Sequence, residues 1–468
     1  MADAETIERL RQYLRELSPA ARALLIGELE RSVLRGEEVG GADLVLHELR
    51  HIMREQHDGA PRISQAARLL FKPLEPFLVD DRGDHKHPGR IARSSLELLW
   101  NWIRRDLLPE EAKALTDKVG GAWLAGDERK AEYVARAFQD SVAAAIAANF
   151  ERAMSDEKSY RRMLAQIGTP RASEDATTLK CVLKGRDVLA NLAERLPLRI
   201  GNLADNLLDD CKLLIDGAAA RDRDLLLYGL PAVMSRLAAP WQLIRLGIAA
   251  AGSDTAARVA ETPYGVSVTI VLAELDRMVG ELRHDLHSGH GVAVGASLKT
   301  IHDSARGLRT ELELPIDSTW GRALAAQRTQ IADLLRSKIE SMPGRVRRLL
   351  RPRPSTEIRP DSVLDPDDVA ETEALVEFVG ACRDFASELA INEMTQRTFS
   401  ELQQYLDSGT RALLDGLRHA GAADRSFRQS QVDAAVRFCA KVFGQDYAAL
   451  LCKAAEVANT AERKTARG

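Results

Sequence analysis

Apolar side chains recur at helical spacing along most of this chain, and that periodicity restricts the folds it can adopt. In residues 127–154, for example, Val134, Phe138, Val142 and Ile146 follow one another every four residues. Such spacing places the four side chains on one face of an α-helix. Aromatic residues, which favour strands, make up only 5% of the chain. The sequence therefore predicts an all-α fold, with about 15 to 20 helices in multi-helix bundles and no substantial sheet.

Breaks in the helical pattern divide the 468 residues into expected regions. Gly168 and Pro170 interrupt the pattern once, and four prolines interrupt it again after Leu350. Clustered prolines favour an extended, non-packed segment. We therefore expect two or three domains. The predicted regions are an N-terminal helical domain (1–168), a central apolar helical domain (169–350), a proline-rich linker (351–368), a C-terminal helical domain (369–459) and a frayed tail (460–468).

Charge and cysteine content exclude several classes of protein. The 65 basic and 69 acidic residues leave a net charge of -4, which argues against a nucleic-acid coat protein or a polybasic membrane binder. Five cysteines without a Cys-x-x-Cys pair do not form a disulfide framework. Residues 225–251 are the most apolar, but glycines and prolines interrupt them, so we expect no transmembrane segment. The N-terminus lacks the pattern of a secretory signal, and we expect a soluble, cytoplasmic protein.

A His-Glu-x-x-His motif occurs near the N-terminus, at His47, Glu48 and His51. On a helix the two imidazoles lie one turn apart, where they can bind zinc while the glutamate activates a zinc-bound water. With His57 six residues later, the run resembles the elongated zinc motif of the metzincin metalloproteases. Arg54 stands where that family has a glycine. This resemblance implies an alternative function, a zinc-dependent hydrolase with His47, His51 and His57 as ligands and Glu48 as general base.

The same helix offers a simpler interpretation of these histidines. At about 100° per residue, Leu46, Leu49 and Ile52 cluster on one side, and His47 and His51 fall nearly opposite. Histidines opposite an apolar face belong to a polar, solvated surface. We therefore predict no metal ligand and no cofactor.

A Glu-x-x-His pair occurs twice, at residues 48–51 and 281–284. Paired motifs of this kind resemble the ligand sets of di-iron four-helix bundles, and this possibility stays open. His284 and His287 are also one turn apart, just before Gly289. Imidazoles there are typical of a helix C-terminus, where they interact favourably with the helix dipole.

Five arginines within nine residues form the most concentrated charge in the sequence, and we call them the arginine cluster. Its members are Arg345, Arg347, Arg348, Arg351 and Arg353. The cluster could contact phosphate groups or a partner, or it could pair with the acidic residues that follow between positions 361 and 373. No aromatic residue is interleaved for base stacking, so we do not expect nucleic-acid binding.

These observations favour a non-enzymatic helical protein with an interaction or regulatory role. Amphipathic helices are abundant, and their faces can bind a protein partner. The sequence leaves the oligomeric state and the identity of the partner open.

Overall fold

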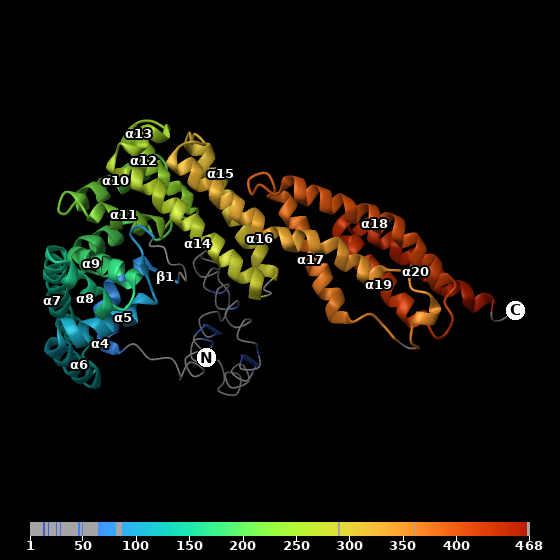
Figure 1. The fold of residues 1–468 in the computed structure, drawn as a ribbon, viewed down its shortest axis with the longest axis horizontal. Coiled ribbons are helices and arrows are strands. Elements are labelled where there is room, and N and C mark those ends of the chain that lie inside the picture. The colour runs from blue at the N-terminus through green and yellow to red at the C-terminus, as the bar shows by residue number, and fades with distance from the viewer. Residues whose placement is uncertain are drawn as a thin grey trace. The chain divides into compact units, whose positions relative to one another are not determined.

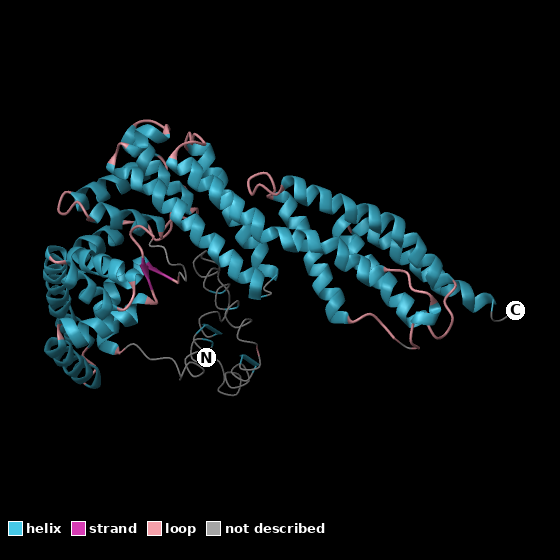
Figure 2. Ribbon diagram, in the orientation of Figure 1, coloured by secondary structure: helices cyan, strands magenta, loops and turns pink. Residues whose placement is uncertain are grey.

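The expected all-α fold is confirmed. The structure is a computed structural model, and its described part contains 17 α-helices (Figure 2). The strands of that part are β1 (Leu78–Val79) and β2 (Ile91–Ala92). Contacts divide the chain into two units, Met1–Arg68 and Leu69–Gly468. The described residues are 64–80, 87–288, 291–360 and 362–465, preceded by Tyr13, Leu14, Leu17, Leu25, Leu29, Val45, Leu46 and Leu49.

The described residues of the first unit include a small apolar core. Leu14 and Leu49 are fully buried there. The partly buried residues packed against them are Leu17, Leu25, Leu29 and Val45.

The second unit begins with helices grouped around α7 (Figure 1). The predicted helix over residues 127–154 is confirmed as α7, where Asp127 accepts a hydrogen bond from the backbone N–H of Lys130 at 3.0 Å. Phe138 and Val142 bury the apolar face, and α6, α8 and α9 pack against α7. The elements of this group are the end of α4 (Gln65–Phe71), a helix that begins in the first unit, and then η1 (Lys72–Phe77), α5 (Ser95–Trp102), η2 (Ile103–Leu107), α6 (Pro109–Leu124), α7 (Glu128–Ser155), α8 (Glu157–Ile167) and α9 (Pro170–Arg195).

The two short strands correct one prediction. The apolar spacing of residues 91–108 predicts a single helix, but Ile91 pairs in parallel with Leu78, and α5 begins only at Ser95. The buried carboxylate of Asp175 accepts a hydrogen bond from the backbone N–H of Ala92 at 3.0 Å. Tertiary contacts therefore hold residues 91–92 in an extended conformation that local periodicity does not predict.

A second group of helices follows, and it ends with the longest helix of the described residues, α16. The pattern predicts an interruption at Pro343, yet α16 continues through it. Proline removes one backbone hydrogen bond from a helix. Here Ile339, Met342 and Pro343 are all buried, and their packing offsets that loss. The elements are α10 (Asp205–Ala219), α11 (Leu225–Met234), η3 (Pro240–Leu243), α12 (Ile244–Ala251), α13 (Ala256–Ala260), η4 (Pro263–Gly265), α14 (Val266–Ser288), α15 (Gly291–Glu311) and α16 (Thr319–Leu350).

The C-terminal helices pack against one another and against α16. They are preceded by η5 (Ser355–Glu357) and comprise α17 (Pro366–Asp384), α18 (Asn392–Arg418), α19 (Arg425–Phe443) and α20 (Gln445–Thr465).

The proline-rich segment is irregular, as its composition predicts, but it is not free of packing. Ile358 is buried, and the hydroxyl of Ser355 donates to Asp424 at 2.8 Å. Farther along, the backbone N–H of Leu364 donates to the hydroxyl of Ser430 at 2.9 Å. These contacts attach the segment to α19 and the residue before it. The division of the chain into five regions remains a prediction.

Candidate functional site

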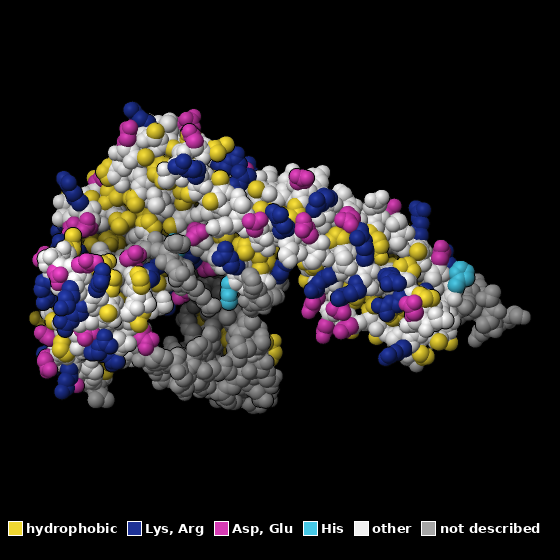
Figure 3. Space-filling model, viewed as in Figure 1, with side chains coloured by type: hydrophobic (Ala, Val, Ile, Leu, Met, Phe, Trp, Pro, Cys, Tyr) yellow, Lys and Arg dark blue, Asp and Glu magenta, His cyan; other side chains and the backbone are white. Residues whose placement is uncertain are grey.

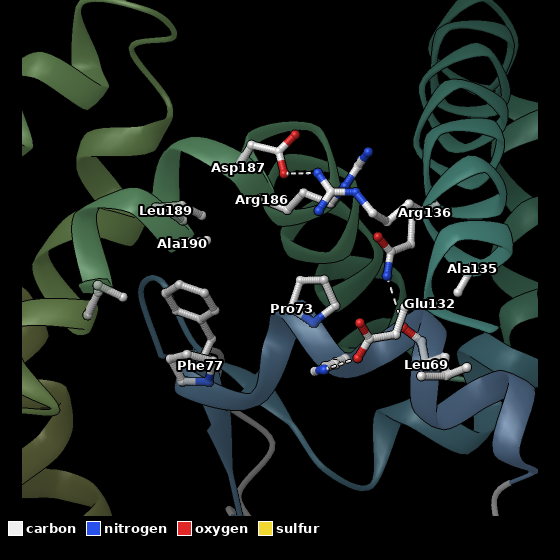
Figure 4. Close-up of a pocket in the computed structure, with 15 residues that line it drawn as sticks. Leu69, Pro73, Phe77, Glu132, Ala135, Arg136, Arg186, Asp187, Leu189 and Ala190 are labelled. Carbon is white, nitrogen blue, oxygen red and sulfur yellow. Dashed lines mark hydrogen bonds and ion pairs between the residues drawn. The ribbon is translucent and has the colours of Figure 1, made fainter. Parts of the chain in front are cut away.

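A cavity of about 320 Å³ opens between η1, α7 and α9, and we call it the η1–α7–α9 cavity. Its volume lies at the lower end of the range for ligand sites, and it matches a large side chain or a small molecule. Figure 4 shows Phe77 of η1 on the same side as Leu189 and Ala190 of α9. The larger apolar residues that line it are Leu69, Pro73, Pro76, Phe77 and Leu189.

Two prolines shape the floor of this cavity. Pro73 and Pro76 tighten the chain after α4 into the 3-10 helix η1, and this turn buries Phe77 against Tyr228, with ring centroids 5.9 Å apart. Since Pro73 has no N–H, the carbonyl of Leu69 lacks its usual helical donor.

The side chain of Gln139 supplies the missing donor from α7. Its Nε2 donates to the carbonyl of Leu69 at 2.9 Å and to that of Leu70 at 3.3 Å. Gln139 is buried, so the two bonds are shielded from water. This amide therefore holds η1 against α7 and fixes the wall of the cavity.

Charged residues surround the cavity mouth in pairs that join different elements. Lys72 of η1 lies 2.6 Å from Glu132 of α7. The guanidinium of Arg136 on α7 pairs with Asp187 on α9, as the dashed line in Figure 4 shows. A third pair joins Arg186 of α9, which lines the cavity, to Asp140 of α7, which does not, with two nitrogen–oxygen contacts of 2.5 and 3.1 Å. The charges at the mouth thus neutralise one another.

These pairs shift the pKa values of their members toward the charged forms. The hydrogen bond from Lys72 lowers the pKa of the Glu132 carboxyl, and the bond from Arg186 lowers that of Asp140. The same bond raises the pKa of Arg186. Carboxylates held in this way stay ionised at neutral pH, and they are poor proton donors there.

The arginine cluster lies at the end of α16, where the sequence predicts a helix terminus. Arg345 lies 3.1 Å from Glu371, Arg348 lies 3.2 Å from Asp368, and Arg347 pairs with Glu401. Pairing with the acidic residues between positions 361 and 373, one of the two interpretations of the cluster, is therefore present for Arg345 and Arg348, whereas the partner of Arg347 lies outside that segment. The other two are not shown in ion pairs, and Arg353 stacks on the ring of Phe427 at 5.1 Å. A role of the cluster in contacting phosphate or a partner remains a prediction.

The proposed zinc ligands His47, His51 and His57, with Glu48, lie outside the described residues. The second Glu-x-x-His pair is described, and there Glu281 is paired with Arg277 of the same helix. No group of three or more potential metal ligands occurs among the residues that the structure describes.

Sequence reasoning missed the cavity. Its apolar and charged residues come from four helices and η1, and they span residues 69–232. The one local signal is the spacing of Pro73 and Pro76, which predicts an irregular segment but not the elements against which it packs.

In the described part of the chain, no helix is long and apolar enough to cross a membrane. Comparison with known proteins identified no relative, since no protein-family model, no curated protein and no solved structure matches this chain.

Proposed function

We propose that this protein is a non-enzymatic interaction protein, and that it binds a partner polypeptide by holding an apolar side chain of that partner in the η1–α7–α9 cavity. The observation that carries the proposal is the composition of the cavity, an apolar interior below a ring of charges that are already paired. Burial of apolar surface stabilises such a complex by about 25 cal/mol per Å².

The charge pairs around the cavity support binding rather than catalysis. Glu132 and Asp140 have lowered pKa values, so neither carboxyl is poised for proton transfer near neutral pH. Lys72 of η1 pairs with Glu132, and Arg186 of α9 pairs with Asp140, so both carboxylates of α7 are held by neighbouring elements. Paired charges of this kind help to exclude the wrong partners more than they add affinity.

We further propose a cytoplasmic location and a protein rather than a nucleic-acid partner. All five cysteines are free thiols, as expected in a reducing compartment. The net charge of -4 does not favour binding to nucleic acid.

A selection from a random dodecapeptide phage library tests the proposal. The bait is the full chain, and the enriched peptides are then measured by fluorescence polarisation against two variants. Ala190→Trp adds an indole to an exposed position that lines the cavity. Ala144→Trp adds the same group to an exposed position of α7 that does not line it.

We expect the enriched peptides to share a leucine, phenylalanine or tryptophan. Their affinity should fall at least about tenfold in Ala190→Trp, because the new side chain occupies the space of the anchor, and it should be unchanged in Ala144→Trp. Failure to enrich any peptide, or equal binding to both variants, would contradict the proposal.

A further inference from the structure

A second concave surface lies on the other flank of α9, between α9 and α10, and we call it the α9–α10 groove. Its volume is about 440 Å³. Val188, Leu192 and Leu214 contribute apolar surface, and the large side chain of Leu213 is 69% exposed. On the face drawn in Figure 3, hydrophobic side chains also gather over α10 and α11, two of the helices that pack against α9.

The charge of this groove differs from that of the cavity. Arg195 and Arg221 line it, and among the described residues neither has a carboxylate within ion-pair distance. The acidic residue of the groove, Asp187, is already paired with Arg136. On α10, Asp216 is likewise held by Lys212 at 2.6 Å. The groove therefore presents two uncompensated positive charges beside an apolar surface.

The cavity and the groove share one residue, Asp187. On a helical projection of α9, Ala190 and Ala193 of the cavity lie nearly opposite Val188 and Arg195 of the groove. Asp187 falls between the two sets and is exposed on the ridge of the helix. A segment that crosses this ridge reaches both sites. The crossing measures about 10 Å, the width of a helix, or three to four residues of extended chain.

We propose that the two sites act together, and that the partner segment carries a carboxylate three or four residues from its apolar anchor. The anchor occupies the η1–α7–α9 cavity, and the carboxylate pairs with Arg195 and Arg221 in the α9–α10 groove. This inference rests on the proposed function, and it adds the chemistry of the partner, an acidic polypeptide segment. Charge complementarity selects this occupant, since guanidinium groups form paired hydrogen bonds with carboxylates.

The peptides enriched in the phage selection test the inference. Each is synthesised in two forms, with its acidic residue kept or replaced by the corresponding amide. Affinities are measured against the intact protein, against Arg195→Ala combined with Arg221→Ala, and against Arg162→Ala combined with Arg129→Ala. The latter two arginines are exposed residues outside both sites, so this variant is a charge-matched control.

We expect the acidic form to bind the groove variant about tenfold more weakly than the intact protein, and the control variant equally well. The amide form should bind all three proteins with the same affinity. A peptide with lysine in place of the acidic residue should recover affinity for Arg195→Glu.

Three results would overturn the inference. If enriched peptides lose affinity in Ala190→Trp but not in the groove variant, the cavity binds a partner and the proposed function stands without the groove. If the two peptide forms bind the intact protein equally, Arg195 and Arg221 do not contact the partner and interact only with the negative C-terminal ends of α9 and α10. If no peptide depends on the cavity, both proposals fail.

Discussion

Replacement of Gln431 with methionine should weaken the last turn of α16. Gln431 of α19 is 1% exposed, and its Nε2 donates to the carbonyls of Leu349 and Arg351 at 2.9 and 3.0 Å. The chain leaves the helical conformation at Arg351, so these carbonyls belong to the end of a helix, where intrahelical donors are missing. Methionine has nearly the same volume and cannot donate a hydrogen bond.

The structure sets the size of the effect. Each buried carbonyl that loses its donor costs about 1–3 kcal/mol. The hydrogen bond to the carbonyl of Arg351 is only partly buried, so water can partly replace it, and the total cost for the two carbonyls falls to about 2–4 kcal/mol. Since about 1.4 kcal/mol corresponds to a factor of ten in an equilibrium constant, local opening should become about 30 to 1000 times more frequent.

Hydrogen exchange with mass spectrometry measures this opening in the full chain. The amides of residues 345–351 should exchange faster by that factor, while those of α7 should keep their rates. Gln429→Met is the matched control, because Gln429 lies on the same helix and donates to Asp433 of that helix at 2.7 Å. It should leave the end of α16 unchanged.

A carboxylate at the same position sharpens the test. In Gln431→Glu an ionised oxygen would face two carbonyl oxygens, so burial and repulsion should raise the pKa of the new carboxyl. The neutral acid can donate one hydrogen bond, and this variant should therefore be more stable at low pH and lose stability as the pH rises through the raised pKa. Exchange in Gln431→Met that matches the unchanged protein would refute the assignment of Gln431 as the cap of α16.

Four further expectations follow from the same structure. Maleimide at pH 7 should label the exposed Cys452 and spare the other four cysteines, because these are buried. Burial also raises the pKa of thiols, for example that of Cys211 to about 11, and rapid labelling of a second thiol would contradict the prediction. Protein purified without a histidine tag should hold no stoichiometric zinc, whereas one equivalent that is lost on His47→Ala with His51→Ala would support the hydrolase. Gly217→Ala should raise the free energy of unfolding by about 0.5–1 kcal/mol, since the added methyl meets no atom within 4 Å; a lower denaturation midpoint would argue against that open space. Alanine at all five positions of the arginine cluster should weaken salt-sensitive partner binding if the cluster contacts the partner, and an unchanged salt dependence would exclude that role.

The fold could be predicted from local sequence wherever one apolar face decides the structure. In α7 the periodic residues Phe138, Val142 and Ile146 are all buried, and the helix extends from Glu128 to Ser155, close to the range that their spacing predicts. Local signals fail where a distant group competes with them. At residues 91–92, for example, the carboxylate of Asp175 accepts a hydrogen bond from the backbone of Ala92, and the chain there is extended rather than helical.

The candidate site was less predictable because pairs of residues far apart in the sequence define it. Arg136 and Asp187 are separated by 51 positions, and each is an ordinary surface residue of its own helix. Their pairing depends on how α7 and α9 pack. No spacing rule in a single sequence encodes that arrangement, whereas the prolines of η1 at least mark the segment as irregular.

Four buried glutamines suggest a general reason why such irregular segments stay in place. Gln139 bonds the carbonyls before η1, Gln431 caps α16, and Gln327 donates to a carbonyl of α14 at 2.8 Å. Gln242 both donates to the carbonyl of Gly201 and accepts from the N–H of Leu203. A neutral amide can satisfy buried backbone groups without the desolvation penalty of a charge. Gln139, Gln431 and Gln242 bond backbone groups where a helix ends or is interrupted. At Gln139 the same bond also positions η1, which lines the proposed binding site. On the proposed function, stability and partner binding are therefore coupled there, and loss of the Gln139 amide should loosen η1 and weaken peptide binding together.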